Sequence, residues 1–142
     1  MKILYIALKY DYGDPSRGLS FEHYNFHDSL VKMNNKEHEI VYFPFDEILL
    51  KKGKEKMNRE LLNIAAKEKP DLCFFFLFKD EITKETLKLL RKKAIIFNWF
   101  ADDHWRFNDF SRRYAPLFDW VATTDSKAPE RYQHIGYKNA IK

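Results

Sequence analysis

The chain has few glycines, a single cysteine and no long hydrophobic run, and each of these shortages excludes a class of protein. None of its four glycines lies in a glycine-rich turn of the kind that brings a backbone close to a phosphate. The sequence therefore contains neither a dinucleotide-binding fingerprint nor a P-loop. Cys73 cannot form a disulfide within the chain, and its apolar neighbours predict a small buried side chain.

Targeting and membrane-spanning segments are also missing from the sequence. The apolar stretch at residues 1–8 is too short for a secretory signal, and no apolar run approaches the roughly 20 residues that cross a bilayer. Lysine and arginine exceed the acidic residues by 25 to 21, but most lysines fall in helix-like stretches among glutamates. This pattern favours solvated helix faces over a nucleic-acid surface. We therefore expect a cytoplasmic protein without a transmembrane segment or a nucleic-acid partner.

What the sequence does contain is an alternation of apolar runs and helical patterns. Strands are predicted at residues 2–8, 39–43, 71–78, 94–99 and 118–123, and helices at 19–33, 58–69, 83–93, 108–114 and 126–134. The strands are apolar on both faces, as in a parallel sheet covered by helices on both sides. We expect one α/β domain over residues 1–142, a Rossmann-like or flavodoxin-like three-layer sandwich with a central parallel sheet of five or six strands. Because the first, third and fourth strands are the most apolar, we expect the order 2-1-3-4-5.

Two shorter features complete this pattern. Asp46 is predicted to cap a short helical turn that ends near Gly53. Residues 138–142 resemble the start of a sixth strand, and we expect the chain to be the first domain of a longer protein.

The segment after the fourth predicted strand, residues 97–107, has the densest mixture of ionisable and aromatic side chains. In open parallel sheets, ligands bind outside the carboxyl ends of the strands. Asp102, Asp103 or His104 could accept a proton from a substrate hydroxyl. Alternatively, one aspartate caps the following helix and pairs with Arg106. A metal site is the weakest interpretation, because adjacent residues seldom point at one ion, and we expect none here.

Two further loops are expected at the same edge of the sheet. Residues 9–19 form a connection longer than is usual between a strand and a helix. Its candidate ligand contacts are Tyr10, Tyr12 and Arg17, since a guanidinium can grip a phosphate or carboxylate with two donors.

The loop after the fifth strand contains Thr123, Thr124 and Asp125, which offer hydroxyls and a carboxylate at a helix entrance. Ligand binding and helix capping are both open interpretations of these residues.

His23 and His27 have the helical spacing of a metal-binding pair. No third ligand is evident in the sequence. Because His23 falls on the apolar face of its predicted helix, we expect a hydrogen-bonded interior histidine and no metal site.

Five short motifs follow one another along the chain. They are MKILYI at residues 1–6, EHEIVYF at 37–43, KPDL at 69–72, NWFADD at 98–103 and VATTD at 121–125. Their order resembles the N-terminal domain of GT-B glycosyltransferases, specifically the CgeB-like, spore-maturation-type group. The resemblance covers essentially the whole chain, and the last two motifs are its most specific parts.

The resemblance implies an enzyme in which two Rossmann-like domains face each other across a cleft. The N-terminal domain would contact the sugar or other hydroxyl acceptor, and a C-terminal domain of the same polypeptide would hold the nucleotide-sugar donor. It implies no metal or resident cofactor in this domain, with the nucleotide-sugar as co-substrate. Since the donor domain lies outside this sequence, the chain alone is expected to be inactive.

A mechanistic hypothesis for the loop after the fourth strand follows from the base, the aromatic ring and the cation that lie together in it. Asp102, Asp103 or His104 would deprotonate or orient the acceptor hydroxyl, Trp105 would stack on a sugar ring, and Arg106 would steady an anion. The alternative function is a non-catalytic α/β domain that binds a ligand or a partner.

Overall fold

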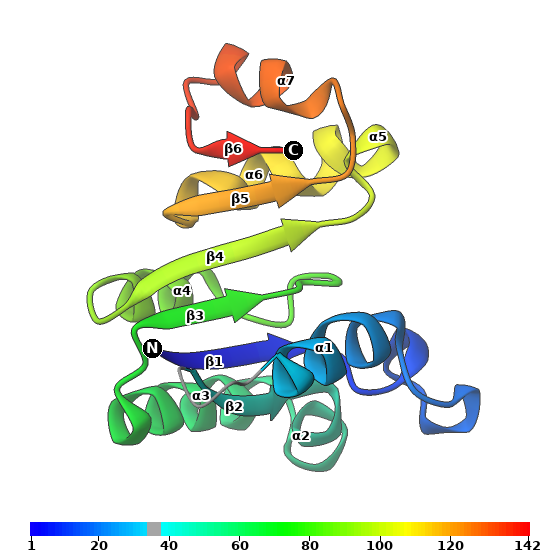
Figure 1. The fold of residues 1–142 in the computed structure, drawn as a ribbon, viewed down its shortest axis with the longest axis vertical. Coiled ribbons are helices and arrows are strands. Elements are labelled where there is room, and N and C mark those ends of the chain that lie inside the picture. The colour runs from blue at the N-terminus through cyan, green and yellow to red at the C-terminus, as the bar shows by residue number, and fades with distance from the viewer. Residues whose placement is uncertain (34–37) are drawn as a thin grey trace.

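Parallel strands form one sheet in the order β2-β1-β3-β4-β5-β6 (Figure 1). The structure is a computed structural model that describes residues 1–33 and 38–142. The strands are β1 Lys2–Ala7, β2 Glu39–Pro44, β3 Leu72–Phe75, β4 Ile95–Phe100, β5 Trp120–Thr123 and β6 Ala140–Ile141. The predicted fold class and strand order are confirmed, and the sixth strand pairs with β5. The fold is a Rossmann-like α/β sandwich.

The first strand lies inside the sheet, between β2 and β3, and this position explains its apolar sequence. Leu4, Tyr5 and Ile6 are fully buried, because successive side chains of a strand point to opposite faces and both faces of β1 are covered. Tyr5 is in register with Tyr42 of β2 and Phe74 of β3.

One face of the sheet carries the larger part of the core. It packs against α2 Phe45–Lys52, α3 Lys54–Glu68, α4 Lys84–Arg91 and α7 Ala128–His134. In α3, Met57, Leu61 and Ala65 recur every four residues and are all buried, which is the stripe that an amphipathic helix presents to a core. Lys69 then ends α3 in a left-handed conformation.

The opposite face is covered mainly by η3, a π-helical turn at His23–His27, and by α1 Asp28–Lys32. Figure 1 shows α1 crossing near β1, while β4 and β5 lie open toward the viewer. On this open part Ile95, Trp120 and Ile141 are 56%, 47% and 49% exposed. Within residues 1–33 and 38–142, no helix covers these side chains.

Three sequence expectations about helices are corrected in their detail. The helix predicted at 108–114 begins earlier, as α5 Asp103–Arg106, and continues through a π-helical turn, η4 Phe107–Ser111, into α6 Arg112–Tyr114. The apolar pattern of residues 83–93 predicts that Leu87, Leu89 and Leu90 all face inward, but Leu89 is 44% exposed on α4. Asp46 is not a helix cap: Pro44 occupies that position of α2, and the Asp46 side chain bonds to another loop.

Each helix in the described ranges 1–33 and 38–142 is too short or too polar to cross a lipid bilayer.

Candidate functional site

A cavity of about 440 Å³ opens at the carboxyl ends of β1, β3 and β4. Aromatic rings form much of its wall: Tyr12, Phe21, Phe76, Phe78, Phe100, Trp105 and Phe110. Charged side chains join them: Asp11, Glu22, Lys79, Asp102 and Arg106. Its volume falls within the range of small-molecule sites, which are apolar clefts with a few polar groups that orient the ligand.

Asp102 and Asp103 are neighbours in sequence but lie in different environments. Asp102 follows β4, lines the cavity and is half-buried. Its backbone carbonyl accepts hydrogen bonds from the amides of Trp105 and Arg106, which starts the α5 turn. Asp103 is fully buried, and its Oδ2 accepts a 2.7 Å hydrogen bond from the hydroxyl of Tyr132. Only Asp102 of this pair is therefore open to a ligand in the cavity.

His104 is exposed and is not part of the cavity lining. Trp105 lines the cavity and is 63% exposed, so one surface of its indole is free for a ligand ring. The Arg106 guanidinium donates to the carbonyl of Phe78 and lies 4.3 Å from the centre of the Phe110 ring. These contacts hold a positive charge at the cavity wall, where it can face an anionic group.

Glu22 is a site residue that sequence reasoning missed. Burial raises the pKa of its carboxyl group, and the negative charges of Asp11 and Asp102 raise it further. These three carboxyl groups come from two different loops and a helical segment, and only the fold brings them together at one cavity. The one signal for Glu22 in the sequence was its position as an acidic residue shortly after the long loop at residues 9–19.

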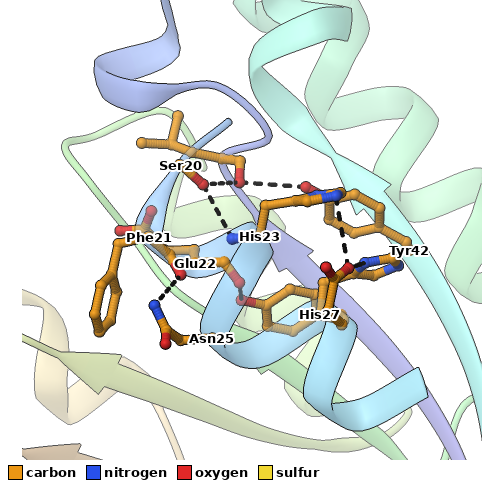
Figure 2. A network of polar contacts seen from close by, with 10 residues as sticks. Ser20, Phe21, Glu22, His23, Asn25, His27 and Tyr42 are labelled. Carbon is orange, nitrogen blue, oxygen red and sulfur yellow. Dashed lines mark hydrogen bonds and ion pairs between the residues drawn. The ribbon is translucent and has the colours of Figure 1, made fainter. Parts of the chain in front are cut away.

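The segment around Glu22 is fixed by hydrogen bonds to β1 (Figure 2). The Tyr5 hydroxyl donates to the carbonyl of Glu22 at 3.0 Å. Ser20 Oγ donates to the carbonyl of Leu8 at 2.8 Å and accepts from the amide of His23 at 3.1 Å. Glu22 is thus held at the edge of the sheet rather than on a free loop.

The first loop is fastened by Asp46, whose side chain is buried. Its two carboxylate oxygens accept hydrogen bonds from the backbone amides of Lys9 and Tyr10, at 3.0 and 2.9 Å. The Tyr10 hydroxyl contacts Glu47 Oε1 at 3.4 Å, and Tyr10 is not among the residues that line the cavity. Tyr10 therefore supports the loop and does not line the site.

Tyr12 and Arg17 differ in their relation to the cavity. Tyr12 lines it and has a positive φ of 52°, an unusual conformation for a bulky residue. Arg17 does not line it; Arg17 Nε pairs with Asp11 Oδ2 at 2.8 Å, and its guanidinium lies 4.6 Å from the centre of the Tyr12 ring. Arg17 thus positions two residues of the wall.

Thr123, Thr124 and Asp125 organise the loop after β5 and do not line the cavity. Thr123 is buried and its hydroxyl accepts from the amide of Asp125. Thr124 donates to the carbonyl of Ala101, which lies beside Asp102. Asp125 accepts from the amide of Lys127 at 2.9 Å, as a turn residue would. Lys127 is the N-cap residue of α7 and no side chain caps that helix, so these three residues form the turn before α7 and do not cap it.

The two histidines considered from the sequence are both half-buried. His23 was expected to be a hydrogen-bonded interior residue, but its Nδ1 is buried without a hydrogen-bond partner among the described residues. Burial and the neighbouring His27 lower the pKa of His23. Together with Asp28, the pair forms a group that could hold a metal ion.

No family model, no curated protein and no solved structure matches the chain. The arrangement of the cavity is therefore the basis for a functional proposal.

Proposed function

We propose that this chain is the acceptor-binding domain of a GT-B glycosyltransferase of the CgeB-like group, and that the acceptor binds in the cavity at the edge of the sheet. The observation that carries the proposal is that Asp102 and Glu22 both line one aromatic cavity. Asp102 is half-buried and faces the cavity, whereas burial and its acidic neighbours raise the pKa of Glu22. Carboxyl groups in unequal environments are suited to unequal roles in proton transfer.

In the proposed reaction, Asp102 takes the proton of the acceptor hydroxyl as its oxygen attacks the anomeric carbon of the donor sugar. The bond between that carbon and the donor phosphate breaks, and the nucleoside diphosphate leaves with the bonding electron pair. Glu22 retains its proton to a higher pH than an ordinary glutamate and donates a hydrogen bond to the acceptor. Removing the hydroxyl proton in the transition state typically contributes a factor of about 10² to 10⁴ to the rate.

The other residues of the wall would bind and orient the acceptor. Trp105 and Tyr12 expose aromatic faces on which a sugar ring can stack, and Arg106 and Lys79 supply positive charge near the cavity. The donor would be held by a second domain of the same polypeptide. The proposal includes a cytoplasmic location, which the free and buried thiol of Cys73 supports.

The test is sugar transfer by the complete gene product. The protein is incubated with UDP-, GDP- and dTDP-linked sugars and a panel of hydroxylated acceptors, and products are identified by mass spectrometry. We expect one donor class to yield a glycosylated acceptor and an equal amount of nucleoside diphosphate. Binding of acceptors in the cavity without transfer from any donor would contradict the proposal and favour a non-catalytic binding domain.

A further inference from the structure

His23, His27 and Asp28 form a compact group on the segment that covers the second face of the sheet. One nitrogen of each imidazole and one carboxylate oxygen of Asp28 lie within 4.8 Å of one another. Asp28 Oδ1 is 3.0 Å from His27 Nδ1 and 3.7 Å from His23 Nε2. Two imidazoles and one carboxylate are a ligand set that suits Zn²⁺.

The π-helical turn of η3 creates this grouping. The amide of Asp28 donates to the carbonyl of His23, five residues earlier. This hydrogen bond places Asp28 one wide turn from His23, with His27 next to it. In an α-helix, residues five apart point about 140° away from each other, so they could not share an ion. Isolated π-helical turns are rare and are frequently found at functional sites.

Two of the three distances between ligand atoms are compatible with a tetrahedral zinc ion, and the shorter one is a hydrogen bond between His27 Nδ1 and Asp28 Oδ1. With metal–ligand lengths near 2.1 Å, the ligand atoms of such an ion lie about 3.4 Å apart. The two distances from Asp28 Oδ1, 3.0 and 3.7 Å, lie on either side of this value. The rings of His23 and His27 are stacked with centres 4.8 Å apart and planes inclined by 24°. Because a metal ion binds in the plane of an imidazole, these nearly parallel rings would have to rotate for both nitrogens to reach one ion.

The group of His23, His27 and Asp28 is partly enclosed and partly accessible to solvent. Tyr42 of β2 lies beside both histidines (Figure 2), with its ring centre 4.4 Å from that of His27 and 5.7 Å from that of His23. The side chains of His23, His27 and Asp28 are 15%, 21% and 36% exposed. Among the described residues, the buried Nδ1 of His23 finds no hydrogen-bond partner. The nitrogen of His23 that faces Asp28 Oδ1 is the other one, Nε2, and it is this atom that would bind the ion.

We propose that His23, His27 and Asp28 bind one Zn²⁺ ion, with water as a fourth ligand, and that this ion stabilises the segment formed by η3 and α1. None of the residues of η3 and α1 is fully buried, although Phe26 and Leu30 pack against the sheet. A metal ion bound only by the folded arrangement would stabilise it. None of the three ligands lines the cavity, and the proposal does not depend on the proposed function.

The first test is a titration of the full chain with Zn²⁺ alone, in which isothermal calorimetry measures the stoichiometry and the affinity. We expect one ion per chain, and at least about tenfold weaker binding in His27→Gln and in Asp28→Asn. The matched control is His134→Gln, which removes an exposed histidine on α7 and should leave the affinity unchanged. Equal affinity in the wild type, His27→Gln and Asp28→Asn would overturn the proposal. So would a wild-type chain that binds no zinc.

A second measurement distinguishes loss of a ligand from loss of the fold. Co²⁺ replaces Zn²⁺ in such sites, and its visible absorption bands report four-coordination. We expect these bands in the wild type and in His134→Gln, and their loss in Asp28→Asn with an unchanged circular dichroism spectrum. Four-coordinate bands that persist in Asp28→Asn would show that these residues are not the ligands.

Discussion

The hydroxyl of Tyr132 donates a hydrogen bond to Oδ2 of Asp103, and both side chains are fully buried. The contact joins α7 to the start of α5, directly beside Asp102. In Tyr132→Phe the buried carboxyl oxygen loses its donor, which costs about 1–3 kcal/mol. We expect the free energy of unfolding to fall by about 2 kcal/mol, measured by urea denaturation with an unchanged m-value.

The matched control for this substitution is Tyr24→Phe. Tyr24 is 57% exposed, so its hydroxyl is solvated in both states and the change should stay within about 0.5 kcal/mol. Equal effects of the two substitutions would show that the contact between Tyr132 and Asp103 contributes little to stability.

The second prediction concerns Asp46, which fastens the first loop. Asp46→Ala leaves the amides of Lys9 and Tyr10 without their acceptor. We expect both amides to exchange with solvent much faster and the free energy of unfolding to fall by about 2–4 kcal/mol. Hydrogen exchange followed by NMR resolves the two amides individually.

Asp14→Ala is the control for Asp46→Ala within the same loop. The Asp14 carboxylate accepts from the amide of Ser16 at an exposed position. This substitution should accelerate exchange at Ser16 and leave the amides of Lys9 and Tyr10 protected. Unchanged protection of those two amides in Asp46→Ala would contradict the role given to Asp46.

Much of the fold could be predicted because the signals lie within single segments. The strands β1, β3 and β4 are apolar on both faces, and their inner positions follow from that pattern. The π-helical turns were not predicted, because each spans only five residues and the apolar spacing was interpreted with an α-helical period. The inward position predicted for Leu89 was wrong because an apolar side chain at the edge of a helical stripe can equally face solvent.

The candidate site was less predictable than the fold. Helix α5 begins at Asp103, five residues before the predicted start, and this separates the environments of Asp102 and Asp103. Asp46 and Glu22 were missed as supports of the site because their partners lie far away in sequence. Asp46 is 36 residues from Tyr10, whose amide it accepts. Only the tertiary structure reveals such pairings.

The third prediction is a pH dependence of stability that comes from Glu22. Burial raises the pKa of Glu22 in the folded chain, so the unfolded chain loses this proton first as the pH rises. The stability due to Glu22 is complete below its unfolded pKa and is lost as the pH rises through the higher folded pKa. Glu22→Gln should remove this decline in denaturation experiments between about pH 4 and pH 8.

The control is Glu55→Gln, which changes an exposed residue of α3 and should keep the pH dependence of the wild type. If Glu22→Gln shows the same pH dependence as the wild type, the environment assigned to Glu22 is incorrect.

The fourth prediction concerns the aromatic wall. Trp105→Ala should weaken binding of the acceptor by about tenfold, which corresponds to about 1.4 kcal/mol. Stability should change little, because Trp105 is 63% exposed. Methyl glycosides serve as probes, and saturation-transfer NMR measures their binding. Trp120→Ala, which removes an exposed tryptophan of β5 outside the cavity, should bind the probes as the wild type does.

The most direct test of the central claim is the turnover of Asp102→Asn in the complete gene product, compared with Asp109→Asn. Asp109 is exposed in η4, the helical turn that follows α5, and does not line the cavity. Once the donor and acceptor are identified, kcat for sugar transfer is measured for both variants and the wild type. Asp102→Asn should lose a factor of about 10² to 10⁴ in kcat, as expected for the loss of a general base, while Asp109→Asn keeps wild-type turnover. Wild-type turnover in Asp102→Asn would contradict the account.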